Sequence, residues 1–200
     1  MNMLASNKFG IDPGLTRGTF FRALLRSIEE TEVYGGGYPK LRLALEFSLQ
    51  TCRVMFRAAH DVGNKLIFVG NGGSCAIASH MAADYTKNGR MRSVALNDAP
   101  TLTCLGNDFG YDQVFAKQIE YYGQPGDVVV IVSTSGKSAN ILAAACAAKT
   151  GNCEVVTFSG MRPDNALRQH GAINFYVPSN DYGLVELAHL ALLHSIVSVE

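Results

Sequence analysis

The sequence lacks an excess of charge of either sign. Its 17 lysines and arginines balance 17 aspartates and glutamates, and no long run of one sign occurs. Nucleic-acid-binding domains and basic membrane anchors both need a concentrated positive patch. The balance therefore argues against nucleic acid and against a membrane surface as partners, and we expect a small-molecule ligand instead.

Paired cysteines are also missing. The chain has five cysteines, an odd number, and they are widely spaced without a C-x-x-C pair. Secreted disulfide frameworks and cysteine zinc sites both depend on recurring, closely spaced pairs. We therefore expect free thiols and a reducing, cytoplasmic environment for Cys52, Cys75, Cys104, Cys146 and Cys153.

No hydrophobic run approaches the roughly 20 apolar residues that a membrane-spanning helix needs. Residues 1–10 carry a lysine with no sustained apolar stretch after it, unlike a signal peptide. Internal repeats, low-complexity segments and linkers are absent too. These absences predict a soluble protein in which residues 1–200 form one domain.

Apolar residues recur at helical spacing in two stretches near the N-terminus. The first runs from Thr16 to Tyr34, and the second runs from Leu41 toward His60. We therefore expect a helical pair within residues 16–62, ahead of an α/β core over residues 65–200. A lone subunit would leave the apolar faces of this pair exposed, which favours a subunit interface. A covering layer of one monomer is the alternative.

Short runs rich in valine and isoleucine then alternate with helical stretches, which is the signature of an α/β fold. Such runs suit a mostly parallel sheet that is covered by helices on both faces, with ligands bound beyond the carboxyl ends of the strands. The expected strands are 66–69, 93–96, 128–132, 154–158 and 173–177.

A glycine-rich loop follows the first of these strands, over residues 70–74, with the sequence Gly-Asn-Gly-Gly-Ser. Small residues let the backbone approach a ligand closely, and the helix that follows directs its free N–H groups at an anion. That helix carries His80 and Asp84 four residues apart, and therefore on one face. The alternative for this pair is an ion pair on the helix surface.

A second polar loop follows the strand at 128–132. It reads Ser-Thr-Ser-Gly-Lys-Ser over residues 133–138, and an alanine-rich helix begins after it. Hydroxyl groups and backbone N–H groups at a helix start form a phosphate site. The spacing is not that of a Walker A loop. A serine-rich helix N-cap is the simpler alternative.

Together the two loops resemble those of the sugar isomerase (SIS) domain family. Three further segments resemble the sedoheptulose-7-phosphate isomerases of that family: Gly106-Asn107-Asp108-Phe109-Gly110, Gly126-Asp127, and the C-terminal helix with Glu186 and His194. The resemblance implies a three-layer fold with a five-stranded parallel sheet. It also implies a homotetramer whose active sites lie between subunits.

The activity that this resemblance implies is an aldose–ketose isomerisation. D-sedoheptulose 7-phosphate would become D-glycero-D-manno-heptose 7-phosphate through a cis-enediol, with the assistance of one Zn²⁺ per subunit. The product serves the heptose units of bacterial lipopolysaccharide. Two other functions stay open: a non-catalytic phosphosugar-binding regulator or adaptor, and an isomerase of another phosphosugar.

The same resemblance assigns roles to individual residues. Asp84 would move the carbon-bound proton and His194 would serve the substrate oxygens. The implied metal ligands are His80, Asp84, Glu186 and His194. The implied substrate contacts are Asn71, Gly72, Gly73, Ser74, Asn107, Asp108, Ser133, Thr134, Ser135, Ser138 and Glu186.

Two positions depart from the family pattern. Asp84 stands where the family usually has glutamate, and Glu186 stands where it usually has glutamine. The C-terminal helix also offers a second histidine, because His189 follows Glu186 at the i, i+3 spacing of carboxylate metal helices. Spacing alone does not choose between His189 and His194, whereas the resemblance favours His194.

Overall fold

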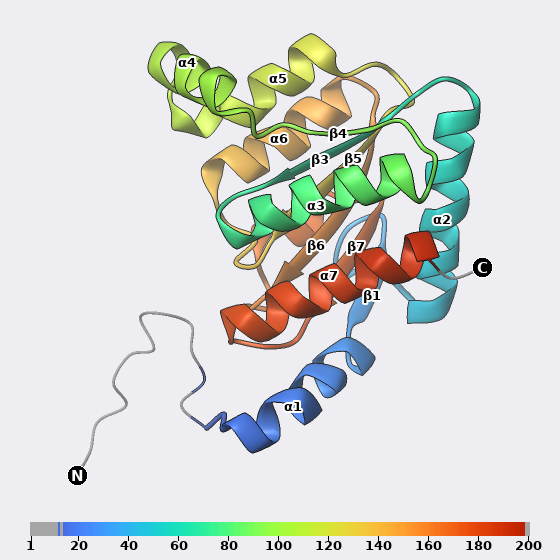
Figure 1. Cartoon of the computed structure of the whole chain (residues 1–200), viewed down its shortest axis with the longest axis vertical. Coiled ribbons are helices and arrows are strands. Elements are labelled where there is room, and N and C mark those ends of the chain that lie inside the picture. The colour runs from blue at the N-terminus through green and yellow to red at the C-terminus, as the bar shows by residue number, and fades with distance from the viewer. Residues whose placement is uncertain (1–11, 13, 199–200) are drawn as a thin grey trace.

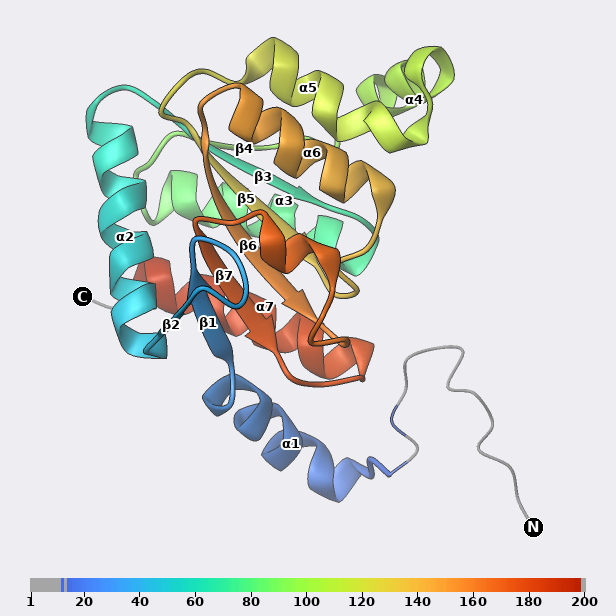
Figure 2. The ribbon, with the colours of Figure 1, turned by 180° about the vertical axis from the view of Figure 1, so that it is seen from behind.

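The computed structural model describes residue 12 and residues 14–198. The stretch 1–10, compared above with a signal peptide, lies outside these residues. A central sheet is sandwiched between two layers of helices (Figure 1). Helices α2, α3 and α7 cover one face, and the view from behind shows α5 and α6 over the other (Figure 2). The expected three-layer α/β architecture is confirmed.

Five parallel strands form the middle of the sheet, and they match the five runs expected from the sequence. Their order in space is β7-β6-β5-β3-β4. All residues of β3, β5 and β7 are buried, as their continuous apolar composition predicts. The strands are β3 (Leu66–Gly70), β4 (Ser93–Ala95), β5 (Val128–Ser133), β6 (Glu154–Gly160) and β7 (Ile173–Val177).

The sheet is larger than expected, because a β-hairpin extends it at the β7 edge. Strand β1 (Glu32–Gly35) pairs antiparallel with β7, and β2 (Leu41–Leu43) pairs antiparallel with β1. The prediction of helix over both segments was therefore wrong there. The open edge of β7 offers unpaired backbone groups, which β1 satisfies while it buries Val33 at 1% exposure. The result is a mixed sheet of seven strands.

Arg168 holds this hairpin against the sheet. Its guanidinium is fully buried and lies 3.9 Å from the ring centre of Tyr38 and 4.1 Å from that of Tyr176. A nitrogen of the same group lies 3.1 Å from a carboxylate oxygen of Glu32 on β1. Stacking on two rings and an ion pair together stabilise a buried charge that would otherwise be costly.

Two hydrophobic clusters fill the spaces between the layers. The larger one lies under α2, α3 and α7, and the other under α4, α5 and α6. Among the described helices, none is long and apolar enough to cross a membrane. The helices are α1 (Arg17–Glu29), α2 (Leu45–Asp61), α3 (Gly73–Lys87), α4 (Ala99–Phe109), α5 (Val114–Tyr122), α6 (Ala139–Thr150) and α7 (Tyr182–Ser198).

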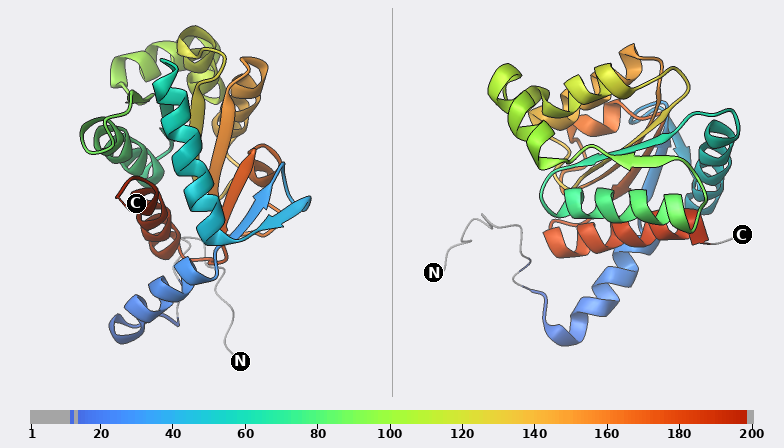
Figure 3. Two further views of the ribbon diagram at one scale, coloured as in Figure 1. Left: turned by 90° about the vertical axis from the view of Figure 1, so that its right-hand side faces the viewer. Right: turned by 45° about the horizontal axis from the view of Figure 1, so that its top comes forward.

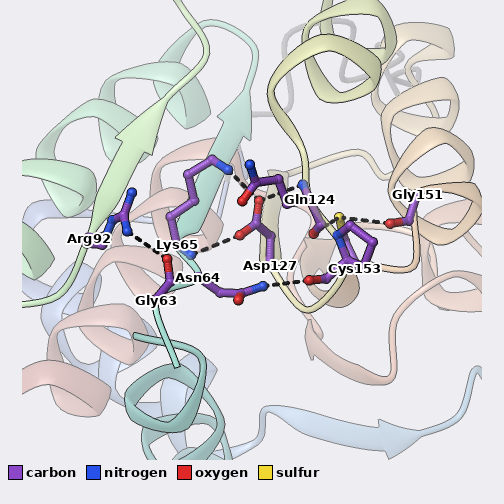
Figure 4. A network of polar contacts seen from close by, with 9 residues as sticks. Gly63, Asn64, Lys65, Arg92, Gln124, Asp127, Gly151 and Cys153 are labelled. Atoms are coloured by element: carbon purple, nitrogen blue, oxygen red, sulfur yellow. Dashed lines mark hydrogen bonds and ion pairs between the residues drawn. The ribbon is translucent and has the colours of Figure 1, made fainter. Parts of the chain in front are cut away.

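A polar network fixes the amino ends of β3 and β5 (Figure 4). The carboxylate of Asp127 is fully buried, and it accepts hydrogen bonds from the backbone N–H groups of Lys65 and Gln124, both at 2.9 Å. The ammonium of Lys65 lies 2.5 Å from the same carboxylate. This pair aligns the two strands at one edge of the sheet, so that their carboxyl ends meet at the opposite edge.

Replacing Asp127 should therefore destabilise the whole fold. We expect Asp127→Ala to lower the free energy of unfolding by about 3 kcal/mol, because it leaves Lys65 and two backbone donors without their acceptor. Urea denaturation measures this. Asp164→Ala, which removes an exposed ion pair with Arg162, is the control and should change stability by less than about 1 kcal/mol. Equal effects of the two variants would contradict the structural role of Asp127.

Candidate active site

The glycine-rich loop after β3 and the hydroxyl-rich loop after β5 meet at the carboxyl edge of the sheet. They enclose a cavity of about 210 Å³ together with the first turns of α7. Both loops were predicted to bind a phosphosugar, and most of the predicted contacts line this one cavity. The lining residues are Asn71, Gly72, Gly73, Ser74, Ser133, Thr134, Ser135, Ser138, Tyr182 and Glu186.

Two glycines make the first loop possible. Gly72 has a φ of +54°, in the left-handed region that favours glycine. A Cβ atom at Gly73 would lie 2.5 Å from both carboxylate oxygens of Glu186. A side chain at residue 73 would therefore displace the Glu186 carboxylate from its place beside the start of α3, and the free N–H groups of the first turn of α3 lie beside the cavity.

The second loop presents hydroxyl groups to the same cavity. The side chain of Thr134 is buried, and its hydroxyl has no hydrogen-bond partner within the described chain. Ser138 stands at the N-cap of α6 with no side-chain cap hydrogen bond. A buried hydroxyl without a partner is costly in a folded protein. Unpaired donors beside two helix N-termini thus form a site suited to an anion.

The other part of the site lies further along α3 and α7, which run side by side on one face of the sheet (Figure 3). The ring nitrogens Nε2 of His80 and His194 are 3.3 Å apart. One carboxylate oxygen of Asp84 lies 3.8 Å from Nε2 of His80 and 3.4 Å from Nδ1 of His194. The structure therefore brings together three of the four predicted metal ligands.

A buried hydrogen bond sets the register of these two helices. The hydroxyl of Tyr85 donates to the carbonyl oxygen of Leu193 at 2.9 Å, and the Tyr85 ring packs between Phe56 and Phe68. Burial raises the pKa of this phenol well above its usual value, so it stays a donor. Because Tyr85 follows Asp84 and Leu193 precedes His194, the bond holds those two residues opposite each other.

The donor set suits a divalent metal ion. Two imidazoles and one carboxylate, with one atom of each lying within 4.8 Å of the others, are the ligands of many catalytic zinc sites. Zinc–nitrogen bonds of about 2.0–2.1 Å at tetrahedral angles place two nitrogens about 3.3–3.4 Å apart. The observed separation of the His80 and His194 nitrogens agrees with that value.

Glu186 lies outside this three-residue group. Its carboxylate lies against Gly73 and lines the cavity, and burial raises its pKa above the usual value. Its predicted contact with substrate thus has a place in the geometry, whereas the structure does not bring it to the group as a fourth ligand.

His189 lies one turn after Glu186 on α7, and it belongs to the core. It is fully buried, with Nε2 3.1 Å from the carbonyl oxygen of Ser159 and its ring edge-on to Phe158. Burial lowers its pKa to about 4, so the neutral imidazole donates from Nε2. Of the two candidate histidines on α7, it is His194 that meets His80 and Asp84.

Asn107 and Asp108 are not brought to the cavity. Both are exposed on α4, where the Asn107 amide donates to the Asp108 carboxylate at 2.9 Å. Just beyond them, Gly110 has a φ of +88° and turns the chain. Tyr111 then reaches back, and its hydroxyl lies 3.3 Å from Oδ1 of Asn71.

Sequence reasoning missed three residues around the cavity: Tyr111, Asn140 and Tyr182. The sequence could have indicated Asn140, because it is a polar residue at the second position of an alanine-rich helix. In the structure it is 3% exposed. Tyr182 begins α7 and lines the cavity. Neither tyrosine had a sequence pattern that separated it from the chain's other tyrosines.

The buried imidazole of His189 gives the protein a predictable acid sensitivity. An unfolded histidine binds a proton near pH 6.5, whereas the folded His189 does so only near pH 4. Stability is therefore fully present above pH 6.5 and falls by up to about 3 kcal/mol as the pH drops toward 4. His189→Gln keeps a donor for Ser159 without titrating. Urea denaturation across this range should show a flatter pH profile for the variant, and identical profiles would contradict this assignment.

Comparison with known proteins identifies a family for this chain. The SIS domain profile matches residues 47–160. The phosphoheptose isomerase of Roseiflexus sp. (strain RS-1) is 38% identical over 143 residues, covering 68% of this chain and 72% of that protein. That of Pectobacterium atrosepticum is 34% identical over 160 residues, covering 76% and 81%.

Solved structures show the same relationship. Phosphoheptose isomerase GmhA from Neisseria gonorrhoeae superposes with a TM-score of 0.76 at 30% sequence identity, covering 90% of this chain and 94% of that one. A phosphoheptose isomerase from Francisella tularensis, at 24% identity and a TM-score of 0.77, shares the fold. The chain belongs to the phosphoheptose isomerase family of SIS-domain proteins, a family of aldose–ketose isomerases.

Proposed function

We propose that this protein interconverts D-sedoheptulose 7-phosphate and D-glycero-D-manno-heptose 7-phosphate, a step toward the heptose units of lipopolysaccharide. The main support for this proposal is the placement of two features on the helices α3 and α7. An anion cavity lies at the start of both helices, and a carboxylate with two imidazoles lies further along the same pair. The relatives named above as phosphoheptose isomerases support the choice of substrate.

The substrate phosphate would bind in the cavity. Ser133, Thr134, Ser135 and Ser138 would supply hydroxyl donors, and the first turn of α3 would supply backbone N–H groups. The unpartnered hydroxyl of Thr134 supports this placement. Gly72, which has open space where a Cβ atom would lie, would leave room for the sugar chain beside the phosphate.

The length of the substrate supports the same orientation. His80 lies seven residues after Gly73 on α3, which corresponds to about 10 Å of helix. Since three bonds of an extended chain span about 3.3–3.6 Å, the seven bonds from C2 to phosphorus in a heptulose 7-phosphate reach about 8 Å. A seven-carbon sugar anchored by its phosphate would therefore bring C1 and C2 near the His80–Asp84–His194 group.

Isomerisation through a cis-enediol needs a group that moves a proton between C1 and C2 and another that serves the two oxygens. We assign the carbon-bound proton to Asp84 and the oxygen-bound proton to His194. Asp84 is mostly buried, with 21% side-chain exposure, and His194 is at 37%. Their 3.4 Å separation lets them act on adjacent atoms of one substrate. Aspartate is one methylene shorter than the usual glutamate, so its reach depends on the close packing of α3 against α7.

We further propose that His80, Asp84 and His194 hold one Zn²⁺. The chemistry that zinc supplies in such a donor set is Lewis-acid stabilisation of the negative charge that develops on the substrate oxygens. The protein's part is to hold the three side chains in place and to leave coordination positions for the substrate.

The active site is also proposed to lie between subunits of a homotetramer in the cytoplasm. Helix α1 lies at the edge of the fold (Figure 3), where one side packs against α7, and its other side exposes Phe21 at 72% and Leu25 at 61%. Side-chain exposure of 53% at His80 leaves the group open to a neighbouring subunit. Free thiols at all five cysteines agree with a reducing compartment. A monomeric sedimentation profile at micromolar concentration would contradict the assembly.

The assigned proton-transfer roles predict a large loss of turnover. Asp84→Asn and His194→Ala should each lower kcat for sedoheptulose 7-phosphate by about 10²–10⁴-fold, because each removes a general acid or base. The loss is measured by monitoring the formation of the aldose with chromatography. His60→Ala, at the far end of α2, is the matched histidine control and should keep wild-type turnover. Activity that survives both substitutions would refute the roles, and phosphosugar binding without any wild-type turnover would favour a regulator or adaptor.

The donor set predicts metal binding independently of activity. Protein reconstituted with Zn²⁺ and then dialysed should retain about one ion per chain by elemental analysis, and His80→Ala should lower its affinity by 10-fold or more. His60→Ala should bind zinc as the wild type does. Wild-type protein that retains no divalent ion after reconstitution would remove zinc from the proposal and leave the proton-transfer roles to be tested alone.

A further inference from the structure

The side chain of Asn71, a predicted substrate contact, is hydrogen-bonded by two other side chains, those of Asn140 and Tyr111. We propose that Asn140 and Tyr111 are positioning residues, which fix the carboxamide of Asn71 so that it offers an N–H donor to the phosphosugar. Neither residue was among the predicted contacts. The inference rests on the proposed function, because it assigns Asn71 a ligand in the cavity.

Asn71 and Asn140 form a reciprocal amide pair. Nδ2 of Asn71 donates to Oδ1 of Asn140 at 2.8 Å, and Nδ2 of Asn140 donates back to Oδ1 of Asn71 at 3.0 Å. Two parallel hydrogen bonds fix the plane of a carboxamide, whereas one bond would leave it free to rotate. The pair joins the loop after β3 to the first turn of α6, and hence the two loops of the cavity.

Tyr111, from a third segment of the chain, makes a further hydrogen bond to the Asn71 side chain. Its hydroxyl donates to Oδ1 of Asn71 at 3.3 Å. Tyr111 is 63% exposed, so packing does little to hold it and the hydrogen bond is its link to the site. Tyr111 thus extends the site toward the segment after α4, the helix that carries Asn107 and Asp108.

One hydrogen-bond donor of the Asn71 carboxamide remains for a ligand. A carboxamide oxygen accepts two hydrogen bonds and the amide nitrogen donates two. Asn140 and Tyr111 occupy both acceptor positions on Oδ1, and Asn140 takes one of the two N–H donors. The hydrogen bonds of the described chain leave the second N–H unused, and Asn71 lines the cavity. Asn71 therefore meets a ligand as a donor, which suits phosphate or hydroxyl oxygens.

The burial of Asn140 makes this arrangement hard to change. Asn140 is 3% exposed, so its amide has no water to turn toward if Asn71 rotates. A rotated Asn71 would leave a buried donor or acceptor without a partner, at a cost of about 1–3 kcal/mol. The pair therefore preorganises Asn71 before the substrate arrives, which lowers the cost of binding.

The effect should fall on substrate binding and not on the chemical step. Asn71 lies at the phosphate end of the cavity, nine residues before His80 along the chain, so its contact is equal in the ground state and in the transition state. Loss of such uniform binding raises KM and leaves kcat unchanged. Asn140→Ala should raise KM for sedoheptulose 7-phosphate, and its dissociation constant, by about 5–30-fold. Tyr111→Phe, which removes one hydroxyl, should raise both by about 2–5-fold.

A double-mutant cycle tests whether Asn140 acts through Asn71. Dissociation constants of sedoheptulose 7-phosphate and of inorganic phosphate are measured by calorimetry for Asn71→Ala, Asn140→Ala and the double variant. We expect the double variant to bind as weakly as Asn71→Ala alone, within about twofold, because the two residues form one unit. Additive losses, or unchanged binding in Asn140→Ala, would overturn the inference.

Controls separate positioning from general destabilisation. Asn64→Ala removes an amide hydrogen bond to the carbonyl of Pro125 near the amino ends of the strands. Tyr121→Phe removes the hydroxyl of an exposed tyrosine on α5. Both should keep wild-type dissociation constants, whatever they do to the melting temperature. A loss of binding in the Asn64 variant that tracks its melting temperature would show that stability, not Asn71, governs affinity.

The same measurements distinguish this inference from the proposed function. Wild-type protein that binds the sugar phosphate without converting it would contradict the proposed isomerase activity. The double-mutant cycle of Asn71 and Asn140 would still test the positioning role, because it measures binding. Wild-type protein that binds neither sedoheptulose 7-phosphate nor inorganic phosphate would overturn both.

Discussion

The hydrogen bond from Tyr85 to the carbonyl of Leu193 is the contact on which the site depends. It lies between α3 and α7, is closed off from water by Phe56 and Phe68, and holds Asp84 opposite His194. A shift of one residue along either helix would turn one of these side chains by about 100° and separate them. The packing of the two helices thus determines whether Asp84 and His194, the proposed acid–base pair, lie together at all.

At the start of the same two helices, the backbone of α3 and the end of the Glu186 side chain are in close contact. Gly73 has no side chain, and the carboxylate of Glu186 occupies the space that a Cβ atom would need. This close approach lets the N-terminus of α3, the hydroxyl loop before α6 and the first turns of α7 share one cavity. The proposed phosphate end of the site therefore depends on small residues, and the proposed proton-transfer end depends on helix register.

Local signals predicted much of this from sequence. The five parallel strands were predictable because each is a short apolar run bounded by turn residues, and buried parallel strands need no further specification. The hairpin β1–β2 was not, because the apolar residues in 16–34 and from Leu41 also fit a helical period. Strand formation there depends on the open edge of β7 and on the stacking of Arg168, and both lie more than 100 residues further along the chain.

Residue types and short spacings by themselves determined the two loops and the pairing of His80 with Asp84, because helix geometry places residues four apart on one face whatever surrounds them. The choice of His194 over His189 needed the tertiary structure, since both occupy a helix that is apolar on most sides and only packing decides which face meets α3. The same holds for Asn140 and Tyr111. Their partner Asn71 lies 69 and 40 residues away in sequence, and contacts over such separations are set by the fold and not by local pattern.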